Sequence, residues 1–264
     1  MGNLTPHLML SEEQVEAFFE IGFVILRDVF TPTEIEEMRA GFDRLQKMAY
    51  AISEPGIHNG SDFAIERKES GQVIIHRISW CGAAEPVLLA YGKDPRLLGM
   101  ASQLLGSNEM NQLINQAHFK IPGDNVAFPW HQDSEHRGYG KPWWKDVNGR
   151  GSFVQQAIAI DDVTEESGPL KFIPGSCKLG HLGLLSRSKE EYPALFNPDA
   201  AITGIMKAGS VALFNPYVIH GSEPNRSQKP RRIFINGYAY PGANSRTYPG
   251  RGAGRLLKIA EDTT

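Results

Sequence analysis

Residues 209–225, GSVALFNPYVIHGSEPN, form an apolar stretch that is interrupted and bounded by Gly, Ser, Asn and Pro. Short apolar runs between turn-forming residues are typical of strands in a β-sandwich or barrel. Four other segments after Asn111 have the same pattern: QLINQAHFKIPG, SFVQQAIAIDD, GPLKFIPGS and RRIFINGYAY. The second half of the chain therefore predicts a mainly β structure.

The first part of the chain, about residues 1–110, is predicted to be helical with one buried strand, GFVILRDVF at 22–30. Ser11 and Thr31 each begin a capping box, and Asp94 precedes a proline where a third helix is expected to start. Helices followed by strands indicate an α+β fold in which helices cover a sheet.

The whole chain, 1–264, is expected to be a single domain whose barrel strands lie mostly in 111–245, because no repeat or linker interrupts it. The 27 basic and 30 acidic residues give a net charge of -3, which argues against nucleic acid as a partner. No apolar run is long enough to cross a membrane, and the first residues, MGNLTPHLMLSEEQ, do not resemble a signal peptide. Cys81 and Cys177 have no metal or redox spacing, so we expect a cytoplasmic protein with reduced thiols. The sequence does not predict an oligomeric state.

The segment FPWHQD at 128–133 places His131 and Asp133 two residues apart. Side chains at i and i+2 of an extended strand point to the same side. His220, at the end of a distant apolar strand, can supply a third ligand. Two histidines and one carboxylate form the facial triad of non-haem Fe(II) oxygenases.

Each of these three residues also has an ordinary structural interpretation, as a turn, a solvated or a packed side chain. Zinc with a bound water is an alternative metal. Iron is favoured because no zinc-protease helix motif is present and because O2 chemistry needs vacant coordination positions.

Several motifs together resemble the phytanoyl-CoA dioxygenases (PhyH-type), a family of Fe(II)- and 2-oxoglutarate-dependent oxygenases. The matching segments are PWHQD, AIAIDDVTEESGPLKFIPGS, GSVALFNPYVIHGSEPN, the arginine of KPRRIFINGYAY, and the opening LSEEQVEAFFEIGFVILRDVFTPTEIEEMRAGFD. This resemblance covers nearly the whole chain and is specific for reaction class but not for substrate. It implies a double-stranded β-helix, that is, a jelly roll or cupin-like barrel, with flanking helices. It also implies that the catalytic Fe(II) is held by His131, Asp133 and His220.

The same resemblance implies that Arg231 and Ser222 hold the distal carboxylate of the co-substrate 2-oxoglutarate. Arginine suits this role because its planar guanidinium can bind a carboxylate with two hydrogen bonds. Alternation of apolar residues along the strand does not distinguish Arg231 from Arg232, because each shares its face with apolar neighbours. The family spacing selects Arg231.

Gln116 and His118 lie on one face of the strand NQAHFKIPG, together with Lys120. If this face points inward, Gln116 and His118 would line the cavity beside the cofactor. A solvated polar face, common on antiparallel strands, is the alternative interpretation.

The implied reaction uses O2 to convert 2-oxoglutarate to succinate and CO2 while an unactivated C–H bond of a small-molecule substrate is hydroxylated. Desaturation and ring rearrangement remain open. Asp133 argues against halogenation, because the similar halogenases carry a small residue there. A redox-neutral or non-catalytic cupin-like metal-binding protein is the alternative, although it would not need the carboxylate-binding Arg231.

Residues 135–151 form the longest irregular stretch expected, and they carry several basic residues with Trp143 and Trp144. We expect this loop to flank the mouth of the site, where it can close over an anionic substrate. An ordinary solvated loop fits equally well. Other side chains are expected to serve as surface or core residues without a ligand role: His58, His76, His136, His181 and Trp130.

Overall fold

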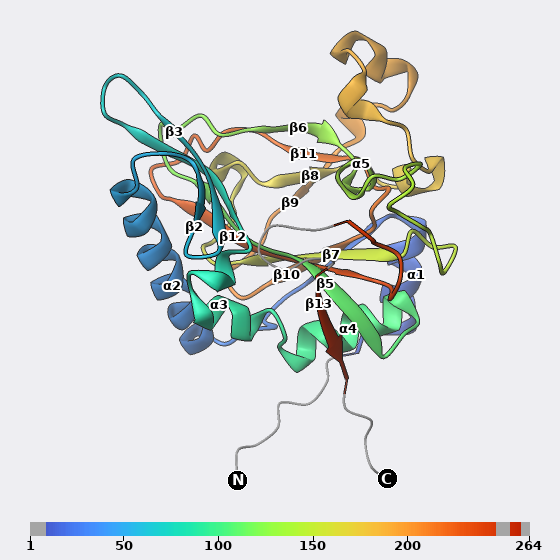
Figure 1. Ribbon diagram of the computed structural model, residues 1–264. Helices are drawn as coiled ribbons and strands as arrows, with labels where there is room; N and C mark the ends of the chain where they lie inside the picture. The colour runs from blue at the N-terminus through green and yellow to red at the C-terminus, as the bar shows by residue number, and fades with distance from the viewer. Residues whose placement is uncertain (1–8, 247–253, 260–264) are drawn as a thin grey trace.

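The computed structural model describes residues 9–246 and 254–259, so the first eight residues, on which the expectation about a signal peptide partly rests, lie outside it. Two antiparallel sheets face each other (Figure 1). The larger sheet has the order β1-β10-β7-β12-β5-β4-β3-β2, with β13 also paired to β5, and the smaller sheet has the order β6-β11-β8-β9. The strands are β1 Phe23–Leu26, β2 Gly56–His58, β3 Ser61–Arg67, β4 Val73–Ser79, β5 Glu109–Lys120, β6 Phe128–His131, β7 Phe153–Ala159, β8 Leu170–Phe172, β9 Ile202–Gly204, β10 Val211–Phe214, β11 His220–Ser222, β12 Arg231–Ala239 and β13 Arg255–Lys258.

Helices α2, α3 and α4 lie on the side of the large sheet that faces away from the small sheet (Figure 1). The expected capping boxes at Ser11 and Thr31 are present, and Asp94 caps the helix that ends before Gly106. The α-helices are α1 Glu12–Glu20, α2 Pro32–Ala51, α3 Pro86–Tyr91, α4 Pro95–Leu105 and α5 Asp133–Arg137. Within the described residues, no helix is both long and apolar enough to span a bilayer.

Strand β12 shows how the two faces of the large sheet are used. Phe234 and Tyr238 belong to the core beneath the helices. Ile233 and Ile235 belong to the core between the two sheets. Because side chains alternate along a strand, Arg231 is on the same face as Ile233 and points between the sheets. The mainly β jelly roll with flanking helices is therefore confirmed.

The first 110 residues contain more strand than predicted. Besides β1, which is half-buried rather than buried, strands β2, β3 and β4 extend the large sheet beyond β5. In SDFAIER, from Ser61 to Arg67, the large apolar residues Phe63 and Ile65 stand at alternate positions, and both are buried. This alternation in the sequence could have revealed β3. A further strand, β13, lies beyond residue 245.

The stretch 135–151 is also more ordered than predicted. Its first residues complete α5, and Trp144 is buried against Tyr139 with ring centroids 5.1 Å apart. Trp143 is exposed. The longest stretch without strand or α-helix is instead 173–201, which contains four short 3₁₀ helices.

Candidate metal centre and co-substrate cavity

The three predicted metal ligands come together from two strands and a helix. His131 ends β6, His220 begins β11, and these two residues are paired across the small sheet. Asp133 is the first residue of α5. One ligand atom from each residue lies within 4.8 Å of the others, a separation that allows one metal ion to bind all three.

Asp133 does not lie on the extended strand with His131, as the i, i+2 argument assumed. The strand ends at His131, and the buried side chain of Gln132 anchors the turn that follows. Its Nε2 donates to the carbonyls of Gly180 (2.7 Å) and Tyr217 (2.6 Å). The carboxylate reaches the same site because this turn begins a helix.

The polar atoms of this group have the arrangement expected for a cation site. His131 Nδ1 lies 2.7 Å from the Pro129 carbonyl, and His220 Nδ1 lies 3.0 Å from the Val218 carbonyl. A backbone acceptor at Nδ1 fixes the proton there and leaves Nε2 free to bind metal. Asp133 is buried, and its Oδ2 has no hydrogen-bond partner among the described residues.

Burial also keeps both imidazoles neutral. Desolvation, followed by the neighbouring His220, lowers the pKa of His131 to about 4. Desolvation likewise lowers the pKa of His220. Fe(II) binds neutral imidazoles and carboxylate oxygens, and this group offers two such imidazoles and the Asp133 oxygen that has no other partner among the described residues. The residues therefore fit the expected metal.

A cavity of about 520 Å³ lies between the two sheets, and the three candidate ligands form part of its wall. Arg231 and Ser222 line it as well. Arg231 is 2% exposed, and its Nε is buried without a hydrogen-bond partner in the described chain. Its NH2 group donates to the Gly168 carbonyl.

A second basic residue, Lys120, lies beside Arg231 and was not predicted to take part. Lys120 lies on β5, where it is paired with Arg231 of β12, and it is 1% exposed. Its Nζ donates to Ser222 Oγ (2.7 Å) and to the backbone carbonyls of Gly168 and Glu223. Desolvation and then the charge of Arg231 lower the pKa of Lys120 to about 6. The charge of Arg231 thus disfavours the protonated form of Lys120, and an anion bound beside both groups would favour it.

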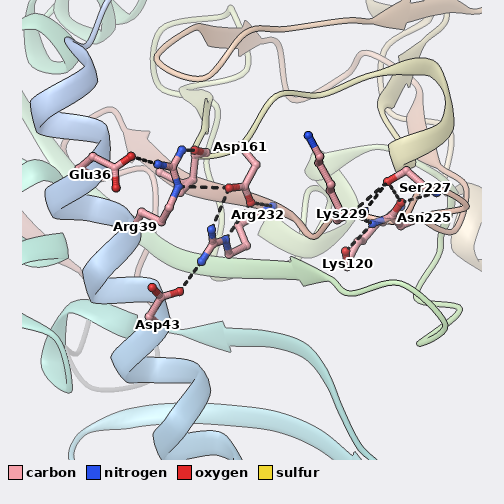
Figure 2. Close-up of polar contacts among 10 residues, drawn as sticks. Glu36, Arg39, Asp43, Lys120, Asp161, Asn225, Ser227, Lys229 and Arg232 are labelled. Carbon is pink, nitrogen blue, oxygen red and sulfur yellow. Dashed lines mark hydrogen bonds and ion pairs between the residues drawn. The ribbon is translucent and has the colours of Figure 1, made fainter.

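Arg232 points away from the cavity, toward α2. Its guanidinium donates to both carboxylate oxygens of Asp161, each at 2.8 Å, and also pairs with Asp43 (Figure 2). Nearby, Asn225 Nδ2 donates to the carbonyls of Lys120 and Lys229, which fixes the turn leading into β12 (Figure 2). This difference between the two arginines was not predictable from apolar alternation.

Gln116 and His118 point inward and line the cavity. Gln116 is opposite Ile235, and His118 is opposite Ile233, on the face of β12 that also carries Arg231. His118 Nε2 lies 3.0 Å from Gln116 Oε1. Desolvation and the charges of Arg77 and Arg231 hold the pKa of His118 well below its usual range.

His136, which was expected to be a surface or core residue, lines the cavity instead, as do several residues that sequence reasoning did not assign. His136 lies on α5, with its ring centroid 5.3 Å from that of His131. Asp62 and Arg77 come from the unpredicted strands β3 and β4, and Arg246 follows β12. For Asp62 and Arg77, strand alternation was the one available signal. Three other described histidines do not line the cavity: His58 contacts the Glu54 carbonyl, His76 lies near Glu66, and His181 hydrogen-bonds Ser134. Trp130 packs against Phe196, as expected of a packing residue.

A jelly roll with two histidines and a carboxylate at its mouth, and buried cations deeper inside, defines the class of Fe(II)- and 2-oxoglutarate-dependent oxygenases. The family model for phytanoyl-CoA dioxygenase (PhyH) matches residues 18–233, so the chain belongs to that family. Ectoine dioxygenase of Bordetella bronchiseptica is 28% identical over 246 residues, which cover 84% of this chain and 73% of that protein. L-proline trans-4-hydroxylase of Streptomyces griseoviridis is 30% identical over 200 residues, with coverages of 64% and 69%.

Solved structures agree on the fold. The crystal structure of EctD from S. alaskensis with 2-oxoglutarate and 5-hydroxyectoine superposes with a TM-score of 0.71 at 24% identity, covering 89% of this chain and 77% of that one. EvdO2 from Micromonospora carbonacea, complexed with 2-oxoglutarate, gives a TM-score of 0.67 at 21% identity, with coverages of 96% and 94%. The chain is a 2-oxoglutarate-dependent dioxygenase that uses Fe(II), 2-oxoglutarate and O2. The redox-neutral alternative is not favoured.

Proposed function

We propose that His131, Asp133 and His220 hold the catalytic Fe(II) of this oxygenase. The observation that carries the proposal is the buried Oδ2 of Asp133, which has no hydrogen-bond partner among the described residues although two neutral imidazoles lie close to it. A buried carboxylate oxygen left in this state is costly unless a cation binds it. The carbonyl contacts at both Nδ1 atoms orient the rings toward that cation.

Arg231 is proposed to bind the distal carboxylate of 2-oxoglutarate, with Ser222 beside it. Lys120 contributes charge and holds Ser222 in place through the 2.7 Å hydrogen bond to its Oγ. Gln116 and His118 form the neighbouring wall and limit the room for water around the co-substrate. A neutral molecule would leave the buried guanidinium of Arg231 without a counter-charge, whereas a carboxylate would pair with it and favour the charged form of Lys120; both effects support a dicarboxylate ligand.

The reaction is hydroxylation of an unactivated C–H bond in a small molecule that carries an anionic group. Bound Fe(II) supplies O2 activation, in which one oxygen atom enters succinate as 2-oxoglutarate loses CO2 and the other enters the substrate. Besides Arg231, three further arginines line the cavity: Arg77, Arg137 and Arg246. These charges support an anionic substrate.

The test is anaerobic titration of the protein with Fe(II) and 2-oxoglutarate, followed by succinate assays. We expect a weak visible charge-transfer band at one Fe(II) per chain, and substrate-dependent succinate formation. L-proline and ectoine, which appear in the names of two relatives, are suitable first probes. No band at saturating 2-oxoglutarate would overturn the site assignment.

A further inference from the structure

We propose that Asp62, Arg77 and Trp80, at one end of the β3–β4 hairpin, form the recognition site for a small zwitterionic substrate. Arg77 and the indole N–H of Trp80 receive its anionic group, and Asp62 receives its cationic group. This inference rests on the proposed function, because it assigns the substrate of the same cavity.

Strand register places these side chains on the wall of the cavity. Arg77 is opposite His118, which is opposite Ile233 on β12. Directly opposed residues point to the same face of a sheet, so Arg77 faces the cavity with His118. Arg77 is two strands away from β12, a lateral distance of about 10 Å. It therefore lies beyond the co-substrate site rather than within it.

Asp62 lies on the same face by the same argument, since it is opposite Ser79, which is opposite Gln116. Ala64, not Asp62, is opposite Arg77, so Asp62 and Arg77 are diagonal neighbours, roughly 7–8 Å apart between Cα atoms. A small molecule with both charges can contact the two side chains together.

Neither charge is paired by another described side chain; Arg77 is exposed and Asp62 is half-buried, so both can be reached by a ligand. No hydrogen bond or ion pair among the described residues involves the side chain of Asp62 or of Arg77. Most other charged side chains around the cavity already have assignments. Arg231 is assigned to the co-substrate, Asp133 to the metal, and Arg246 donates to the His136 carbonyl. Asp62 and Arg77 are thus a pair of opposite charges open to a ligand.

Trp80 provides an independent observation. It is 2% exposed, lines the same cavity, and its Nε1 is buried without a hydrogen-bond partner in the described chain. Its backbone has φ 51°, in the left-handed region that bulky residues rarely adopt. A strained backbone next to an unsatisfied buried donor supports the hypothesis that a ligand binds at this position.

The experiment uses the protein with Fe(II) and 2-oxoglutarate bound. The probes are L-amino acids and N-methylated amino acids, each paired with its carboxamide and with its N-acetyl derivative. Anaerobic binding is followed by the perturbation of the visible band, and turnover is followed by succinate. We expect at least one parent zwitterion to bind, and its carboxamide and N-acetyl partners to bind about tenfold or more weakly.

The variants are Arg77→Gln, Trp80→Phe and Asp62→Asn. Arg77→Gln and Trp80→Phe should remove the preference for the parent amino acid over its carboxamide. Asp62→Asn should remove the preference for the parent amino acid over its N-acetyl derivative. Each should raise KM more than it lowers kcat, with the visible band of the Fe(II)–2-oxoglutarate complex intact. Arg77→Lys should recover part of the acid preference. The matched control is Arg27→Gln, an exposed arginine beyond β1 that does not line the cavity.

The two proposals fail in different ways. A missing visible band contradicts the metal and co-substrate assignment. A normal band with no zwitterion bound, or with acid and amide bound equally, overturns the substrate site alone. Unchanged discrimination in Arg77→Gln and Asp62→Asn would overturn it as well.

Discussion

Arg231 and Arg232 are adjacent in β12, yet their guanidinium groups lie on opposite faces of the large sheet. Arg231 faces the cavity beside Lys120, and Arg232 forms ion pairs with Asp161 and Asp43 under α2. Arg232 is thus held by two acidic residues of the fold, while Arg231 forms no ion pair with an acidic residue among those described. This relationship allows the co-substrate role and the structural role to be tested separately.

Arg231→Ala should weaken 2-oxoglutarate binding by roughly 30-fold or more, because truncating one partner of a buried charged pair costs about 2–5 kcal/mol. Iron content should barely change, since the guanidinium is not a ligand. Titration of the visible band with 2-oxoglutarate measures the effect.

Arg232→Ala is the matched control and should show the opposite pattern. Loss of Arg232 leaves Asp161 without its bidentate partner, so we expect a loss of about 3 kcal/mol in the free energy of unfolding, with near-normal 2-oxoglutarate affinity. Denaturant unfolding checks the first expectation. If the two variants exchanged phenotypes, the assignment of Arg231 would be wrong.

His220→Ala should abolish turnover and iron retention while leaving the fold intact, because the cores on both faces of the large sheet do not depend on a metal. Metal analysis and circular dichroism measure the two effects. His76→Ala serves as control, since His76 is partly exposed near Glu66 and should keep iron and activity. Full iron occupancy in His220→Ala would be incompatible with the proposed triad.

Lys120 should make the stability of the ligand-free protein depend on pH. Its pKa falls from 10.5 to about 6 on folding, through desolvation and the charge of Arg231, with Glu223 opposing the shift. Between these two values the unfolded chain binds more protons than the folded chain, so stability should rise with pH across this window. Thermal unfolding between pH 6 and 9 measures this trend, and Lys120→Met should flatten it.

Binding of 2-oxoglutarate should reverse the shift at Lys120, because a carboxylate beside the ammonium favours its charged form. The complex should therefore take up protons near pH 8. Calorimetry in buffers with different ionisation enthalpies detects this uptake, which Lys120→Met should reduce. Equal apparent enthalpies in all buffers would refute the coupling.

The loop 138–152 is expected to tighten over bound substrate. Trp144 anchors it to the core, while Trp143, Lys141 and Lys145 are exposed. Trypsin cleavage at the lysines should slow when substrate and 2-oxoglutarate are both present. The same cleavage rate with and without saturating substrate would argue against closure.

The sequence by itself determined the elements whose signals are local. Capping residues at Ser11 and Thr31 marked the helix starts, and turn-bounded apolar runs marked most barrel strands. The three candidate metal ligands were identifiable because family motifs keep them at characteristic positions. The spacing of Arg231 from His220 was informative for the same reason.

Only the tertiary structure decided which face of each strand is the inner one. Alternation assigns Arg231 and Arg232 to opposite faces, but the cavity side depends on which layer covers each face, here the small sheet on one side and the helices on the other. Asp133 reaches the site from a helix because Gln132 turns the chain through contacts with residues about 50 and 85 positions away. The pairing of β4 with β5, which brings Arg77 beside His118, is likewise a long-range contact. Such contacts depend on how layers pack, and a local pattern of side chains carries no information about them.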